Sequence, residues 1–123
     1  MTGDLAARAL QQAGDGIIVI DTDGIIRVWS DHCAALFGHP AEEAIGRDIT
    51  LIIPERLRDA HDRAFSAAMA CGHLASDGKP RRTKGIRADG GSVYVTMTFA
   101  VVTDDAGAAI GSVAVAREFV REA

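Results

Sequence analysis

The sequence has little that would place the chain in or across a membrane. No apolar run approaches the roughly 20 residues that a bilayer-spanning helix needs. The amino-terminal stretch MTGDLAARALQQAG is polar and lacks the apolar centre of a signal peptide. Cysteine is also scarce: only Cys33 and Cys71 occur, without CxxC spacing, so nothing requires a disulfide and reduced thiols are favoured. We therefore expect a cytoplasmic protein that does not engage a membrane.

The sequence also lacks the charge excess and the motifs of several functional classes. Its 13 basic residues are outnumbered by 17 acidic ones, which gives a net charge of -4 and a pI of about 5.4, so nucleic acid is not expected as a partner. The basic cluster Lys79–Arg82, with Lys84 and Arg87, is more typical of a solvated loop than of a phosphate site. No Ser-His-Asp, paired-carboxylate or phosphate-loop pattern occurs, and the Asp-Gly pairs are turn residues. We predict that the chain is not an enzyme.

What is present suits one small globular domain. The chain has 123 residues, of which 48% are hydrophobic and 24% charged, as in an ordinary folded protein. Residues 1–13 are predicted to form an amphipathic helix in which Leu5 and Leu10 stand among alanines, suited to capping the domain or to dimerisation. Residues 14–123 are predicted to form the domain itself.

Hydrophobic periodicity and turn residues predict the elements of that domain. Expected strands are residues 17–20, 25–29, 81–87, 93–101 and 109–118. Expected helical segments are residues 4–13, 32–37, 40–44 and 55–70, with an apolar segment at 49–53. Two strands, several helices and three strands follow in turn, with no βαβ alternation, so an α+β fold is expected: a five-stranded antiparallel sheet with the helices packed on one face.

Specific residues are expected to begin and end these helices. Asp4 can cap the first helix, and Ser30 or Asp31 the second, because their side-chain oxygens can accept hydrogen bonds from unpaired amides in the first turn. Gly38 and Gly72 follow the second and the longest helix, in the position where a left-handed residue commonly ends a helix.

These elements resemble a PAS domain. The opening GIIVIDTDGIIRVWSDHCAALFGHPAEEAIGRDI resembles the first hairpin of that family, its N-x-A-x-x-x-F-G helix and its E-E-x-I-G segment. The segments RADGGSVYVTMTFAVV and IGSVAVAREFV resemble its last three strands. The resemblance runs from about Gly14 to Val120, and it implies a sensor or docking module with a pocket between the sheet and the long helix, whose ligand the fold does not fix.

The long helix carries the residues from which a ligand can be inferred. Leu57, His61 and Phe65 share its apolar face, where a histidine needs a hydrogen bond or a metal as a partner. The segment PERLRDAHDRAF resembles the haem-PAS domains of FixL-type oxygen sensors, in which the histidine of a P-E-x-x-R-x-x-H-D sequence is the proximal iron ligand; His61 falls on that position. In the same register, Arg81 falls on the arginine that those sensors use near bound oxygen.

The resemblance therefore implies a domain that binds haem b and a diatomic gas (O2, CO or NO), with His61 on the iron and Arg81 on the other side of the haem. Met97, expected to face inward, is either a sixth iron ligand or core. The full set of expected cofactor-binding residues is Leu57, His61, Phe65, Met69, Arg81, Val95, Met97 and Phe99. A homodimer and a separate effector, such as a histidine kinase or cyclase, are the expected partners.

Other functions stay open at this point. One alternative is a cofactor-free PAS module that dimerises and relays signals to a protein partner. Another is a pocket for a small apolar or carboxylated metabolite. Flavin is not expected, because neither Cys33 nor Cys71 lies in the G-x-N-C-R-F-L-Q motif of flavin-binding light sensors.

Overall fold

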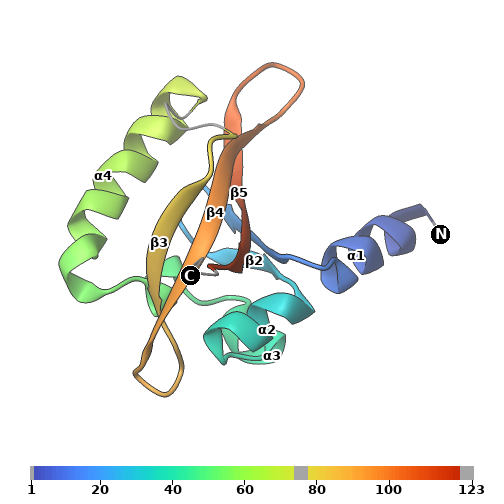
Figure 1. The fold of residues 1–123 in the computed structure, drawn as a ribbon. Coiled ribbons are helices and arrows are strands. Elements are labelled where there is room, and N and C mark those ends of the chain that lie inside the picture. Colours follow the sequence, from blue (N-terminus) through green and yellow to red (C-terminus); the bar gives the residue numbers. More distant parts are fainter. Residues whose placement is uncertain (1, 74–77, 120–123) are drawn as a thin grey trace.

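The computed structural model describes residues 2–73 and 78–119, which form one five-stranded sheet with helices beside it (Figure 1). In chain order the elements are α1 (Thr2–Gln12), β1 (Gly16–Asp21), β2 (Ile26–Trp29), α2 (Asp31–Phe37), α3 (Ala41–Ala44), the 3-10 helix η1 (Ile49–Ile52), α4 (Glu55–Cys71), β3 (Arg81–Ile86), β4 (Ser92–Thr103) and β5 (Ala109–Glu118). The predicted α+β class is confirmed.

The strands lie side by side in the order β2-β1-β5-β4-β3, and every neighbouring pair is antiparallel. The first hairpin is joined to the last strand, because β1 pairs with both β2 and β5. β3 forms one edge of the sheet, so its only strand partner is β4. β3 also borders the candidate site.

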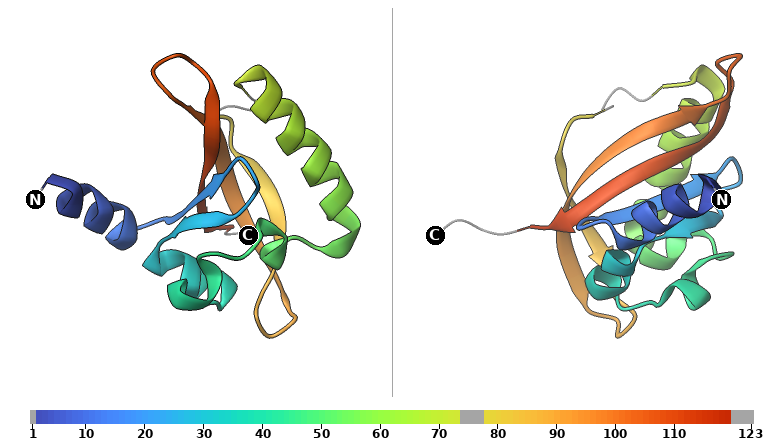
Figure 2. Two further views of the ribbon diagram at one scale, coloured as in Figure 1. Left: turned by 180° about the vertical axis from the view of Figure 1, so that it is seen from behind. Right: turned by 90° about the vertical axis from the view of Figure 1, so that its right-hand side faces the viewer.

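One face of the sheet carries the core. Its alternate residues are buried, namely Ile18 and Ile20 of β1, Val95 and Met97 of β4, and Ala116 of β5. They pack with apolar residues of α2, α3 and η1. In Figures 1 and 2, α4 runs along this side near β3, whereas α1 lies on the opposite side of the sheet. The expectation that the helices cover one face therefore fits α2 to α4 and not α1.

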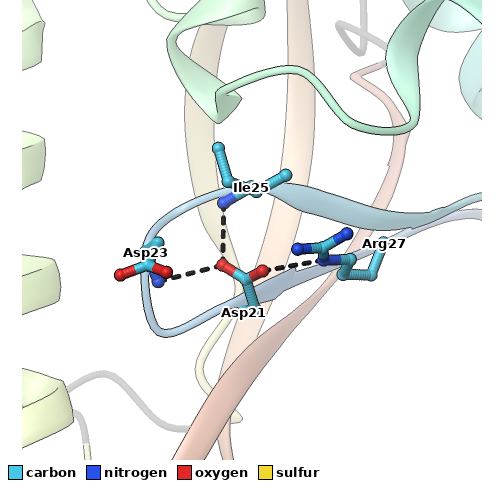
Figure 3. A network of polar contacts seen from close by, with 4 residues as sticks. All are labelled: Asp21, Asp23, Ile25 and Arg27. Carbon is cyan, nitrogen blue, oxygen red and sulfur yellow. Dashed lines mark hydrogen bonds and ion pairs between the residues drawn. The ribbon is translucent and has the colours of Figure 1, made fainter.

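The turn between β1 and β2 is organised by one carboxylate, as Figure 3 shows. Asp21 Oδ1 accepts hydrogen bonds from the backbone amides of Asp23 at 2.9 Å and Ile25 at 3.1 Å, and Oδ2 accepts one from Arg27 Nε at 2.7 Å. The hydrogen bond from the Ile25 amide is the largest influence that lowers the pKa of Asp21, because it stabilises the charged form. The sequence predicted the hairpin, and this bonding explains its tight turn.

The carboxyl-terminal ends of α2 and α4 agree with the sequence, whereas the predicted amino-terminal capping bond of Ser30 is absent. Gly38 and Gly72 end α2 and α4 with φ of 81° and 83°, as predicted. Ser30 is at the amino-terminal cap of α2, yet its side chain makes no capping bond. Instead Oγ accepts a hydrogen bond from the Ile17 amide at 2.8 Å and approaches the Asp15 carbonyl at 3.4 Å. Ser30 therefore occupies the predicted cap position but lacks the predicted capping hydrogen bond, because its buried hydroxyl bonds to the start of β1 instead.

Helix α1 packs little against the rest of the domain. It begins at Thr2, so Asp4 lies within its first turn and not at the cap position that we predicted. Residues 4–12 are all exposed, with Leu5 77% and Leu10 39% accessible. No helix within residues 2–73 and 78–119 is long and apolar enough to cross a membrane.

Candidate functional site

A cavity of about 460 Å³ lies between α4 and the core-facing side of the sheet. Its walls are mostly apolar and come from β1, α2, η1, α4, β3, β4 and β5. Five polar residues also line it: His61, Arg81, Thr83, Lys84 and Ser112. The volume falls in the range of small-molecule and cofactor sites, which run from roughly 300 to 1,000 Å³. An apolar chamber with a few polar groups is therefore available for a ligand.

The cavity exists because α4 does not press its apolar face onto the sheet. Of its 17 residues only Ala68 is buried. Leu57, His61 and Phe65 follow helical spacing and all line the cavity, but each is only half-buried. A helix that packed directly on a sheet would bury this face, so the helix covers a chamber that its own side chains leave open.

Gly85 of β3 sets how closely this strand approaches the helices. A Cβ built on Gly85 would lie 2.8 Å from Cε1 of Phe37 and 3.4 Å from the carbonyl oxygen of Ile52. Only a residue without a side chain fits at that separation, so β3 reaches α2 and η1 and closes one wall of the cavity.

His61 has an unusual environment. Its side chain is 30% exposed, yet its Nδ1 atom is buried and makes no hydrogen bond. Asp62 Oδ1 lies 3.7 Å away, which is close enough for a loose ion pair if the imidazole is protonated but too long for a hydrogen bond. The ring stacks parallel to Phe65 one turn later, with centroids 6.1 Å apart and planes 5° apart. A buried nitrogen without a partner is costly. The ring itself lines the cavity, and this position makes the imidazole a candidate ligand.

Arg81 and Met97 border the cavity from the opposite side. They are direct partners in the β3–β4 register, so their side chains leave the same face of the sheet. Met97 is 5% exposed and belongs to the core. Arg81 is exposed, and its side chain has no ion-pair partner in the part of the chain that the structure describes. The cavity thus has a thioether inside and a guanidinium at its edge.

The residues expected to bind a cofactor come together with one exception. The lining contains Leu57, His61, Phe65, Arg81, Val95, Met97 and Phe99. Met69 is half-buried but is not among the lining residues; in the last turn of α4 only Ala68 reaches the cavity. The lining also includes residues that sequence reasoning missed, among them Ile18 and Ile20 of β1. Residues 17–20 are all apolar, so the sequence carried no signal for which of them face the cavity; their burial alternates only in the structure.

Neither cysteine lines the cavity. The Cys33 thiol is buried in α2, accepts a hydrogen bond from Ser30 Oγ at 3.6 Å and donates one to the Ile17 carbonyl at 3.5 Å. Burial raises the pKa of Cys33, which keeps the thiol protonated. Cys71 is exposed at the end of α4 and donates to the His73 carbonyl at 3.1 Å. Both thiols therefore stand apart from the candidate site.

Comparisons with known proteins relate this geometry to a family. Among curated proteins, the chain is 37% identical over 76 residues to the sensor protein FixL of Bradyrhizobium diazoefficiens, a match that covers 62% of this chain and 15% of that protein. A second relative, an uncharacterized protein of Azorhizobium caulinodans, is 33% identical over 92 residues, which cover 73% of this chain and 12% of that protein. The chain therefore corresponds to a small part of each relative.

Solved structures with similar folds support the same assignment. The PAS domain of a protein from Colwellia psychrerythraea has a TM-score of 0.77 at 19% identity, with 97% of this chain and 98% of that chain covered. A Rhodobacter sphaeroides LOV protein has a TM-score of 0.74 at 12% identity, with 98% and 68% covered. These identities establish the fold alone. The family model described as the PAS fold matches residues 5–119, and the chain belongs to the PAS family.

Proposed function

We propose that this PAS domain is a sensor that would hold haem b in the cavity beneath α4, with His61 as the protein ligand of the iron and a diatomic gas as the signal. The observation that carries the proposal is the imidazole of His61, which lines the cavity from the apolar face of α4. The resemblance of PERLRDAHDRAF to FixL-type haem domains points to the same residue.

The residues present fit a haem better than a bare metal ion. No group of three or more His, Cys, Asp or Glu side chains gathers anywhere in residues 2–73 and 78–119. A bare transition-metal ion needs such a group, whereas haem iron takes its equatorial ligands from the porphyrin and needs one protein side chain. The apolar walls suit the porphyrin, and stacking on Phe65 holds the imidazole plane. When bound, the haem would supply an iron atom with a site for a gas.

Two further side chains of the lining have proposed roles. Arg81 carries guanidinium donors at the cavity edge, and we assign it to the gas-binding side of the haem. Met97 is nine-tenths or more buried and lines the cavity, which suits either a wall or a sixth ligand. Leu57, Phe65, Val95 and Phe99 would form the apolar walls.

A second candidate function is a module without a cofactor that acts through protein contacts. The exposed α1 favours it, because Leu5 and Leu10 belong to a helix that packs little within its own chain. The sheet face opposite α4 also carries half-buried apolar residues, including Val19 and its register partner Val113. A homodimer would cover both surfaces and is compatible with either function. A separate effector such as a histidine kinase or cyclase would then read the state of the domain.

The exposed thiol of Cys71 supports a separate proposal about the cellular compartment. Cys71 is an exposed free thiol, which persists best in a reducing environment. We therefore assign the domain to the cytoplasm.

Titration with haemin separates these functions. The purified protein is titrated and the visible spectra of the ferric, ferrous and CO-bound forms are recorded. We expect saturation at one haemin per chain with a sharp Soret band that is lost in His61→Ala. His32→Ala is the matched control, because His32 lies on α2 and does not line the cavity. No saturable Soret band, or equal spectra for His61→Ala and wild type, would defeat the haem proposal. In that case the cofactor-free module or a metabolite pocket remains.

A further inference from the structure

On the sheet face away from the cavity, one arginine lies between two aromatic rings. The guanidinium carbon of Arg82 is 5.3 Å from the ring centroid of Tyr94 and 5.3 Å from that of Phe119. Both distances are within the range of cation–π attraction. These three residues, which we call the Arg82 clamp, come from β3, from β4 and from the position just after β5. The clamp therefore ties three separate segments together at one point.

Arg82 directly follows Arg81, which lines the cavity. Successive residues of a strand point to opposite faces of the sheet, so Arg81 borders the cavity while Arg82 reaches the other side. Their register partners on β4 are Met97 and Thr96. β3 is an edge strand whose only strand partner is β4, and its contact with α2 and η1 is at Gly85, toward its other end. The Arg81–Arg82 end is therefore the part of this wall that can shift with least disturbance to the sheet.

The other end of the clamp is where the chain leaves the sheet. Phe119 directly follows β5, and its backbone amide donates a hydrogen bond to the Tyr94 carbonyl at 3.1 Å. Its half-buried ring is held by Arg82. A movement of β3 would change the contact between Arg82 and the ring, and with it the strength of that last backbone hydrogen bond.

We propose that the Arg82 clamp couples occupancy of the cavity to the anchoring of Phe119 at the end of β5. The proposal rests on the cavity being a ligand site, as proposed above, but it does not depend on haem being the ligand. Coupling of this kind is reciprocal, so loosening Phe119 must also alter ligand affinity.

The anchoring itself can be measured without a ligand. Amide hydrogen exchange of Phe119, followed by NMR, reports how often its bond to Tyr94 opens. In Arg82→Ala we expect exchange at Phe119 to be about fivefold faster or more, since two cation–π contacts are lost. Arg117→Ala is the matched control, because Arg117 is also an exposed arginine near the end of β5 but pairs with Asp15 at 2.8 Å. Exchange at Phe119 that is equal in Arg82→Ala and wild type would overturn the proposal.

The coupling is then tested by occupying the cavity. If haemin gives a Soret band, its binding should change Phe119 exchange at least about threefold in wild type and in Arg117→Ala, but not in Arg82→Ala. If no Soret band forms, the haem proposal fails and Thr83→Phe replaces the ligand, because Thr83 lines the cavity from β3 and the larger side chain is a fixed occupant. Thr83→Leu is used if circular dichroism shows that Thr83→Phe is unfolded. A Phe119 response that is absent, or that persists in Arg82→Ala, overturns the coupling in either arm.

Discussion

Filling the cavity should stabilise the empty domain and weaken ligand binding at the same time. Ala68 is the buried residue of α4 and lines the cavity, so Ala68→Leu places three more carbons in that space. At about 0.8 kcal/mol for each buried carbon the transfer gains about 2.4 kcal/mol, and ordering the leucine costs about 0.5–1 kcal/mol. The expected net gain is about 1.5 kcal/mol, or about 6 °C in Tm for a domain of this size.

Urea unfolding followed by circular dichroism measures this gain. Ala67→Leu is the matched control, since Ala67 is the preceding residue of α4, is exposed and does not line the cavity; its stability should change by no more than about 0.5 kcal/mol. Haemin affinity should fall at least about tenfold in Ala68→Leu and stay unchanged in Ala67→Leu. A loss of about 1–3 kcal/mol in Ala68→Leu would show overpacking, and would refute the inference of an open chamber beneath α4.

Three further predictions concern single side chains. Arg81→Ala should speed oxygen release from the ferrous haem form and change CO release less, because only bound oxygen carries enough negative charge to accept a strong hydrogen bond from the guanidinium. Stopped-flow release rates that change equally for both gases would remove the role of Arg81. Ser30→Ala should lower the free energy of unfolding in urea by about 1–3 kcal/mol, because the Ile17 amide loses the acceptor that lies 2.8 Å away. The control Ser66→Ala changes an exposed serine and should leave the free energy of unfolding almost unchanged. Equal unfolding midpoints for the two variants would contradict the account of Ser30. Asp21 has a lowered pKa in the folded state, so its stabilising contribution is present above the ordinary aspartate pKa and is lost as the pH falls through the folded-state pKa. Asp21→Asn should therefore be less stable than wild type at pH 7, and the two stabilities should converge in acid. Stability curves that run parallel across this pH range would contradict this.

Local patterns were sufficient for the elements of the fold. The alternation of β4 and the glycines after α2 and α4 are short-range signals, because strand faces and left-handed helix ends depend on neighbouring residues. The orientation of His61 could also be predicted, since its spacing from Leu57 and Phe65 is helical.

Features that depend on distant pairing could not be predicted. Ser30 resembles a helix cap in the sequence, but its hydroxyl bonds to Ile17 because the hairpin brings the two together. The cavity walls from β1 arise because Ile18 lies opposite Ala114 of β5, a contact that joins the two ends of the chain. The contact of Arg82 with Phe119 likewise requires the finished order of strands.

Rescue of a glycine variant by free imidazole tests the central claim most directly. His61→Gly removes the imidazole and leaves a space of its size beside the cavity. The account predicts that this variant does not give the wild-type Soret spectrum with haemin, and that added imidazole restores the spectrum by ligating the iron in place of the missing side chain. A wild-type spectrum without imidazole, or no response to imidazole, would contradict ligation by His61.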